Sequence, residues 1–253
     1  MNLEEKSYIF GLLGTDGSLN ISGNKGKVTL EVNHKDKDIV EKLFSLIPNS
    51  SISERTRDTN LKKNYSSCSF VNYRKEFREE LISFGFPLKD KTNTISTPSQ
   101  KYSERDFWRG VIDGDGSVGF TANNFPFVSL VTKSESLKQA YCQMLYNNFN
   151  IEKNISRNKR DNVYNIMLNK EDAQKLCDYL YTDASLYLNR KYEKAMEVLK
   201  WIRPDNMKKI STRKKWDSVQ DEYILTHTIE ESMKHLDRTK KSIQTRLYRL
   251  NNR

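Results

Sequence analysis

The strongest constraint on the fold is a motif that occurs twice in the 253-residue chain. Tyr8–Ser18 reads YIFGLLGTDGS, and Phe107–Ser117 reads FWRGVIDGDGS. In both segments an apolar run and a glycine precede Asp-Gly-Ser, and the two aspartates, Asp16 and Asp115, are 99 residues apart. Self-similarity at a fixed spacing indicates a repeated structural unit. We therefore expect two copies of one unit within about the first 200 residues.

The sequence after each motif predicts the same succession of elements. Val28, Leu30 and Val32 alternate with polar residues, which is typical of a strand with one buried face. The predicted strands are 18–22, 27–33, 51–57 and 65–71 in the first copy and 117–121, 126–132, 153–158 and 163–169 in the second; the predicted helices after the motifs are 38–47, 74–84, 135–149 and 171–180. The prediction is an α+β fold with two pseudo-symmetric αββαββα repeats, 1–100 and 101–203.

The motif residues themselves indicate how the repeats would meet. Gly11 and Gly110 occupy equivalent positions, Gly14 lies three residues after Gly11, and small residues allow two helix backbones to approach closely. We expect each motif to be a short helix that ends at a glycine, with Asp16 and Asp115 just beyond the helix ends. Two adjacent carboxylates at helix C-termini repel each other and the helix dipole unless a divalent cation binds. Oxygen ligands suit Mg²⁺, which activates water in phosphodiester cleavage. The alternative for each Asp-Gly is an ordinary turn after a helix.

Ile9–Gly17 (IFGLLGTDG) and Trp108–Gly116 (WRGVIDGDG) resemble the two copies of the LAGLIDADG motif. The resemblance covers roughly residues 1–200 and is to LAGLIDADG homing endonucleases in their single-chain, two-repeat form. It implies two four-stranded sheets that form a saddle in the DNA major groove. It also implies Mg²⁺-dependent hydrolysis of both strands across the minor groove, leaving short 3′ overhangs, in the context of intron homing.

The same resemblance implies roles for individual residues. Asp16 and Asp115 would be the catalytic acids, and the backbone carbonyls of Thr15 and Gly114 would also contact the metal. Asp113, at the sixth motif position, departs from the pattern and is expected to be structural or to lie beside the site. Nearby basic residues are expected to neutralise charge at the cut phosphate: Lys89, Lys91, Arg190 and Lys191. His34 is either a polar residue that orders water or, the interpretation we prefer, a surface loop residue.

The polar faces of the two sheets are the predicted surface for reading DNA. Arg and Lys suit guanine and Asn suits adenine, although the sequence does not separate base contacts from phosphate contacts. The candidates are Asn20, Ser22, Lys25, Lys27, Thr29, Glu31, Arg55 and Arg57 in the first repeat, and Asn123, Asn124, Ser129, Arg157, Lys159 and Arg160 in the second. Because the two halves differ in sequence, we expect a monomer that recognises a long asymmetric site.

The C-terminal part of the chain is strongly basic. Residues 203–253 contain 13 Lys and Arg against 7 Asp and Glu. After a linker at 204–213, helices are predicted at 218–228, 230–236 and 238–249, with Ile243, Leu247 and Leu250 on one apolar stripe. The module at 214–253 resembles Myb/SANT-like helix-turn-helix domains. Its last helix would present Lys240, Lys241, Gln244 and Thr245 to DNA. The alternative is a basic amphipathic tail that packs on the core.

Composition narrows the function classes. The net charge of +10 favours a polyanionic partner. No apolar run has the roughly 18 residues that a membrane helix needs, the N-terminus lacks a secretory signal, and three scattered cysteines suit neither a disulfide framework nor a zinc finger. A cytoplasmic or organellar protein is therefore expected. Besides the endonuclease, two functions remain open: an RNA maturase that binds intron RNA, and a non-catalytic DNA-binding regulator.

Overall fold

The structure is a computed structural model, and it describes residues 1–23, 25–58, 63–205, 207 and 216–252. The chain divides into two compact units, Met1–Arg203 and Pro204–Arg253. Most of the predicted linker, namely residues 206 and 208–213, lies outside the described residues, as do residues 214 and 215 of the predicted C-terminal module.

The first repeat contains a four-stranded antiparallel sheet in the order β1-β2-β4-β3. Helix α2 packs on β3 and β4, and α3 packs on β2. The elements are α1 (Leu3–Thr15), β1 (Gly17–Ser22), β2 (Lys25–Asn33), the 3-10 helix η1 (His34–Asp36), α2 (Lys37–Leu46), β3 (Ser50–Arg57), β4 (Tyr65–Asn72), α3 (Lys75–Ser83) and the single turn α4 (Lys91–Thr94).

The second repeat has the same succession with a smaller sheet, in which three antiparallel strands follow the order β5-β6-β7. Its elements are α5 (Glu104–Asp115), β5 (Gly116–Phe120), β6 (Pro126–Thr132), α6 (Glu135–Phe149), β7 (Tyr164–Asn169), α7 (Glu171–Tyr181) and α8 (Asn189–Leu199). The mixed α+β class with two antiparallel sheets is confirmed. Helix α8 was not predicted.

The predicted strand at 153–158 is wrong, because this segment has no regular secondary structure. Its sequence, KNISRN, has a single apolar residue among side chains that strands disfavour. The Nζ of Lys153 donates to the carbonyl of Met167 at 3.0 Å, so a side chain occupies an acceptor on β7 that a fourth strand would use. The expectation of two four-stranded sheets therefore holds only for the first repeat.

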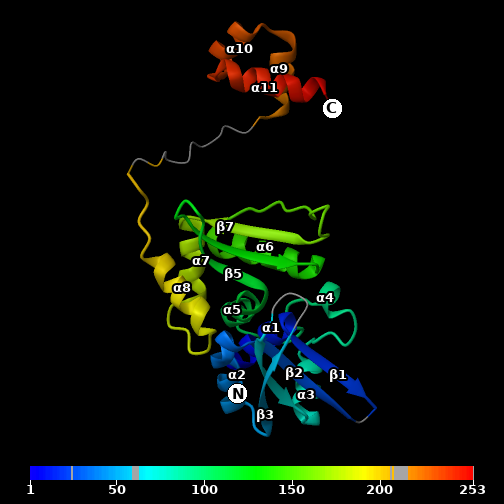
Figure 1. Cartoon of the computed structure of the whole chain (residues 1–253). Coiled ribbons are helices and arrows are strands. Elements are labelled where there is room, and N and C mark those ends of the chain that lie inside the picture. The colour runs from blue at the N-terminus through cyan, green and yellow to red at the C-terminus, as the bar shows by residue number, and fades with distance from the viewer. Residues whose placement is uncertain (24, 59–62, 206, 208–215, 253) are drawn as a thin grey trace. The chain divides into compact units, whose positions relative to one another are not determined.

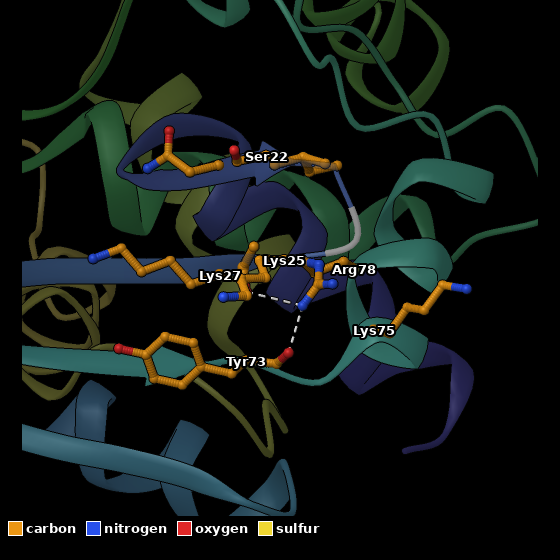
Figure 2. A pocket seen from close by; sticks show the side chains of 9 residues that line it. Ser22, Lys25, Lys27, Tyr73, Lys75 and Arg78 are labelled. Carbon is orange, nitrogen blue, oxygen red and sulfur yellow. Dashed lines mark hydrogen bonds between the residues drawn. The ribbon is translucent and has the colours of Figure 1, made fainter.

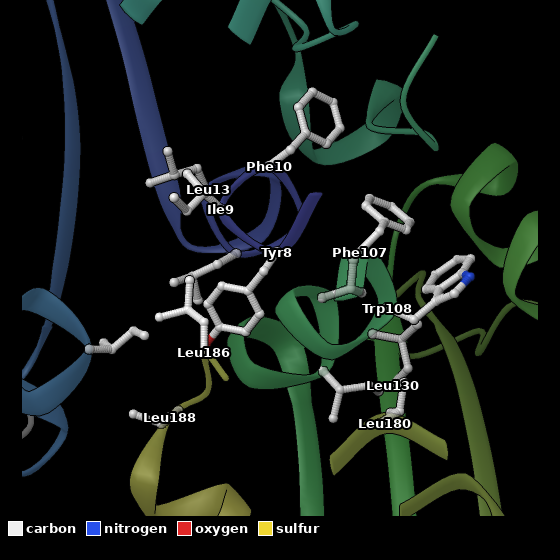
Figure 3. Close-up of a cluster of buried hydrophobic side chains, with 14 of the residues drawn as sticks. Tyr8, Ile9, Phe10, Leu13, Phe107, Trp108, Leu130, Leu180, Leu186 and Leu188 are labelled. Atoms are coloured by element: carbon white, nitrogen blue, oxygen red, sulfur yellow. The ribbon is translucent and has the colours of Figure 1, made fainter. Parts of the chain in front are cut away.

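Helices α1 and α5 lie between the two sheets and form the centre of the first unit (Figure 1). Their aromatic side chains are fully buried and close around the crossing, as Figure 3 shows for Tyr8, Phe10, Phe107 and Trp108. Phe107 and Trp108 meet edge to face, with ring centroids 4.8 Å apart. Because the core runs continuously through this contact, the two repeats fold as one body.

The described residues of the C-terminal unit form three helices: α9 (Ser218–Thr226), α10 (Ile229–Leu236) and α11 (Lys240–Asn251). Ile224 and Ile243 are its buried apolar side chains. The guanidinium of Arg238 lies 3.9 Å from the centroid of the Trp216 ring and adds a cation–π contact to this small core. The three predicted helices are confirmed. No helix among the described residues has the length and apolar character needed to cross a membrane.

Candidate catalytic site and nucleic-acid face

Glycines set the distance between the two central helices. A Cβ atom on Gly11 would lie 2.3 Å from the carbonyl oxygen of Phe107, and one on Gly110 would lie 2.1 Å from that of Tyr8. Both distances are too short for real atoms, so neither position accepts a side chain. The two contacts are reciprocal, since each glycine faces the carbonyl three residues before the other. The predicted close approach of the helices at Gly11 and Gly110 is confirmed.

The crossing brings the C-terminal ends of the helices together. A Cβ on Gly114 would lie 1.9 Å from the Thr15 Oγ1 and 3.6 Å from the Asp16 Cγ. Asp16 is the C-cap of α1, as expected, whereas Asp115 is the last residue of α5 rather than a residue beyond it. Because Gly114 directly precedes Asp115, the two carboxylates share one region of the surface. The side chains of both reach solvent.

The two carboxylates are partly desolvated and influence each other. Loss of hydration, followed by the charge of Asp16, raises the pKa of Asp115 to about 6. Loss of hydration also raises the pKa of Asp16, while Lys191 and Lys91 act in the opposite direction. Holding two like charges together costs free energy, which a cation or a proton at the site would recover.

Two lysines close the ends of the motif helices. The Nζ of Lys191 donates to the carbonyls of Ile112, Asp113, Gly114 and Gly116 at 2.6–2.9 Å. Lys91 does the same at the other helix, where its Nζ donates to the carbonyls of Thr15 and Gly17. Carbonyls in the last turn have no partner within a helix, and the end carries negative charge, so a buried ammonium satisfies both needs. Burial lowers the pKa of both lysines.

The other two predicted basic residues, Lys89 and Arg190, do not hydrogen-bond to the ends of the motif helices. Lys89 is exposed. Arg190 forms a two-pronged ion pair with the buried Asp36, at 2.8 and 2.9 Å, and so ties the second repeat to the start of α2. His34 lies in η1 with its Nε2 3.3 Å from a carboxylate oxygen of Glu54, as expected of a surface residue.

Asp113 is buried and satisfied within the protein. Its carboxylate accepts hydrogen bonds from the hydroxyls of Tyr8 and Tyr181, both at 2.7 Å, and from the backbone N–H of Leu188 at 2.8 Å. Burial raises its pKa despite these bonds. These contacts fit the structural role predicted for Asp113.

A pocket of about 300 Å³ adjoins Asp115. Thr15, Lys91 and Lys133 are among its lining residues, so an acidic group and two ammonium groups meet there. Sequence reasoning missed Lys133, although a cation at the end of a predicted strand was a usable signal. The described residues contain no cluster of three or more His, Cys, Asp and Glu side chains that could hold a metal. Any metal here would rely on two carboxylates and on backbone oxygens.

The first sheet gathers all of the DNA-contact candidates of its repeat on one face. Val28 and Leu30 of β2 are fully buried, and the alternate residues point to the opposite side. Strand register extends that side across the sheet, pairing Asn20 with Lys27 and Arg57 with Tyr65. The residues on this face are Asn20, Ser22, Lys25, Lys27, Thr29, Glu31, Arg55 and Arg57. Glu31 is partnered there by Arg57 at 3.1 Å and by Ser67 at 2.7 Å.

The second repeat scatters its candidates. Ser129 lies on the open face of β6, and Asn123 and Asn124 lie in the turn between β5 and β6. Arg157 is occupied by protein groups, because it donates to the Tyr164 hydroxyl and the Lys133 carbonyl, both at 2.9 Å. Lys159 and Arg160 lie in a turn, where Arg160 pairs with the neighbouring Asp161. The missing strand therefore removes the row of polar side chains that the sequence predicted.

Helix α11 presents its predicted polar residues to solvent. Lys240, Lys241, Gln244 and Thr245 are exposed, while Ile243 on the opposite side is buried. The Thr239 hydroxyl caps the helix by accepting from the N–H of Ser242 at 3.3 Å.

Comparison with known families follows the division into repeats. Residues 103–181 match the model of the LAGLIDADG-like domain, and residues 5–67 match that of the WhiA LAGLIDADG-like domain. Both repeats are LAGLIDADG-like. These matches support the LAGLIDADG family assignment that the motifs at 9–17 and 108–116 predicted.

Solved LAGLIDADG structures share the fold of the first unit. The homing endonuclease I-WcaI, bound to its DNA recognition sequence, has 15% sequence identity and a TM-score of 0.56 over 77% of this chain and 86% of that chain. The meganuclease I-SmaMI, bound to uncleavable DNA, has 11% identity and a TM-score of 0.51 over 77% of this chain and 88% of that chain. At these identities the similarity establishes the fold only. Among curated proteins, no sequence match was found.

Proposed function

We propose that this chain is a sequence-specific endonuclease that hydrolyses one phosphodiester bond in each strand of double-stranded DNA. The observation that carries the proposal is the convergence of Asp16 and Asp115 at the ends of two crossing helices, one end closed by the buried Lys191 and the other by the partly buried Lys91. The LAGLIDADG structures with this fold support DNA as the partner, because I-WcaI was solved on its DNA recognition sequence.

The donor set of this site fits Mg²⁺. Its donors are all oxygens: the carboxylates of Asp16 and Asp115, which reach solvent, and the backbone carbonyls of Thr15 and Gly114, each of which already accepts a hydrogen bond from a lysine Nζ and has one lone pair left. Loss of hydration, followed by the charge of Asp16, raises the pKa of Asp115, so a cation bound beside the pair would favour its ionised form. When bound, Mg²⁺ would activate water and neutralise charge at the cut phosphate.

The chain's own residues prepare the site. Lys91 and Lys191 hold the helix ends in place and keep positive charge beside the carboxylates. Their charges offset part of the rise in the pKa values of the two carboxyl groups. Asp16 and Asp115 each precede the first strand of a sheet, so DNA lying on the open sheet faces would reach both acids. Because the two sheets carry different side chains, a monomer would recognise an asymmetric target, as expected of intron homing.

The C-terminal unit adds a second DNA contact in this proposal. Its three helices, with a capped last helix and a basic exposed face, are consistent with a Myb/SANT-like helix-turn-helix module. Replacing Lys240 and Lys241 with alanine should weaken duplex binding and leave the rate of the cleavage step unchanged.

A cleavage selection tests the nuclease directly. The full-length protein is incubated with Mg²⁺ and a library of duplexes with a randomised centre, and the cut ends are sequenced. We expect one enriched asymmetric site with breaks in both strands, and no enrichment with the Asp16→Asn or Asp115→Asn variants. Full cutting by either variant would remove that residue from the catalytic role.

A non-catalytic DNA-binding regulator is the second candidate. The match of residues 5–67 to the WhiA LAGLIDADG-like domain favours it, since this family also includes members without nuclease activity. Binding to a selected duplex, with no nick in either strand with or without Mg²⁺, would establish this function instead.

A further inference from the structure

A basic hollow lies at the end of the first sheet farthest along β1 from Asp16. It has a volume of about 720 Å³ and is formed by the adjoining ends of β1 and β2 and by the junction of β4 with α3. Asn20, Lys25 and Lys27 contribute from the strands, and Tyr73, Lys75 and Arg78 contribute from the junction. Figure 2 shows the side chains of Lys27, on β2, and of Tyr73, directly after β4, extending in the same direction.

Arg78 holds the two sides of the hollow together. The side chain is only 5% exposed, and its Nη1 donates to the carbonyl of Gly26 at 2.9 Å and to that of Tyr73, as the dashed lines in Figure 2 show. A Cβ on Gly26 would lie 2.5 Å from the Asn20 carbonyl and 3.0 Å from the Arg78 Nε. The glycine is therefore needed for Arg78 to reach this position, and the hollow is a built feature of the fold.

The groups around the hollow suit a nucleotide backbone. Lys25 and Lys27 take part in no ion pair with any residue that the structure describes, and Lys75 has only an exposed i,i+4 pair with Glu79 at 3.4 Å. Exposed pairs of this kind contribute little and break readily when a stronger partner arrives. Tyr73 is 64% exposed, so its ring is accessible to a ligand, and tyrosine combines an apolar ring with a polar hydroxyl.

The corresponding corner of the second repeat has none of these groups. The strand pairing shows which residues correspond. Val28 pairs with Asn72 in the first repeat, and Val128 pairs with Leu168 in the second, so Lys27, which precedes Val28, corresponds to Phe127. By the same register Tyr73 corresponds to Asn169. Lys75 and Arg78, the first and fourth residues of α3, correspond to Glu171 and Gln174 of α7. Glu171 is itself paired with Arg203.

We infer that this hollow binds the sugar-phosphate backbone of duplex DNA at the outer end of the first repeat's half-site, independently of base sequence. The inference rests on the proposed function for the direction in which DNA lies. Lys25 and Lys75 contact phosphates, Tyr73 packs on the adjacent sugar, and Arg78 is a positioning residue. The second repeat has no equivalent grip, so the two ends of the DNA interface differ in kind.

The test needs no knowledge of the target. Fluorescence anisotropy measures binding of the full-length protein to duplexes of about 30 base pairs with unrelated sequences, without divalent cation, at about 50–200 mM KCl. Lys75→Gln should lower the slope of log affinity against log salt by about 1 on every sequence, because one phosphate contact is lost. Tyr73→Ala should weaken binding roughly fivefold with the slope unchanged, because a neutral side chain releases no counterion.

Lys175→Gln is the matched control, since Lys175 is an exposed lysine on α7 of the second repeat. It should leave affinity and slope unchanged. A salt slope for Lys75→Gln equal to the control's, together with wild-type affinity for Tyr73→Ala, would overturn the inference and leave the nuclease proposal standing. A loss seen only with single-stranded RNA of the same length would also overturn it. The expected losses in a protein that never cuts DNA would support the hollow and reject the nuclease.

Discussion

The two repeats are alike where they meet and different where they end. At the centre, Gly11 and Gly110 make reciprocal contacts, and Lys91 and Lys191 close equivalent helix ends. At the periphery, the first repeat has four strands and a basic corner, whereas the second has three strands and a corner with Glu171. The close contact at the centre constrains both copies in the same way, whereas the outer regions are not bound by it and differ in strands and in charge.

The largest expected effect comes from breaking the symmetric centre. Gly110→Ala places a methyl group where the Tyr8 carbonyl lies, so the helices must separate, and we expect a loss of about 3 kcal/mol in the free energy of unfolding. Gly119→Ala is the control, because its Cβ would meet only the Phe127 ring at 3.6 Å. Urea unfolding of both variants checks this, and equal midpoints would refute the close approach.

The next effect tests whether the two acids are equivalent. Asp16→Asn and Asp115→Asn should each lower the rate of cleavage of a selected site by about 100-fold or more, because each removes a carboxylate from the shared site. The rate of nicking is followed on each strand separately. A variant that slows one strand while the other is cut at the wild-type rate would show that the acids act independently.

Replacing the two lysines that cap the motif helices should have smaller effects on the free energy of unfolding than Gly110→Ala. Lys191→Met leaves four carbonyls without their cation and should lower the free energy of unfolding by about 2 kcal/mol; Lys91→Met, with fewer partners, should cost about 1 kcal/mol. Thermal unfolding without divalent cations measures both, with Lys89→Met as the exposed control. An equal loss for Lys191→Met and Lys89→Met would contradict the capping role.

The smallest effect concerns protons at the centre. Since the folded pKa of Asp115 is raised to about 6, its protonated form stabilises the metal-free fold at low pH. That contribution is lost as the pH rises from about 4 through 6. Carboxyl carbon NMR should show one of the paired acids titrating near pH 6, and Asp16→Asn should lower the pKa of Asp115. An unchanged pKa in that variant would mean that the charge of Asp16 does not reach it.

The sequence predicted the centre better than the periphery, for a physical reason. Glycine spacing and the positions of Asp16 and Asp115 are strictly local patterns, and they placed the helix crossing correctly. The roles of Lys191 and Asp36 depend on contacts between residues at least 75 positions apart, which no local pattern records. The strand predicted at 153–158 failed because strand formation depends on the neighbouring edge, where Lys153 already takes the Met167 carbonyl.

The Tyr8–Asp113 hydrogen bond has a consequence for how the halves choose each other. The residue equivalent to Tyr8 is Phe107, and the residue equivalent to Asp113 is Gly14. Two first halves placed together would set each tyrosine hydroxyl opposite a glycine, which has no side-chain acceptor, and two second halves would set each buried carboxylate opposite a phenylalanine, which has no donor. The glycine contacts alone would permit two like halves to pair. The Tyr8–Asp113 hydrogen bond gives the pairing of a first half with a second half the lower free energy, and so favours pairing of the two halves within one chain.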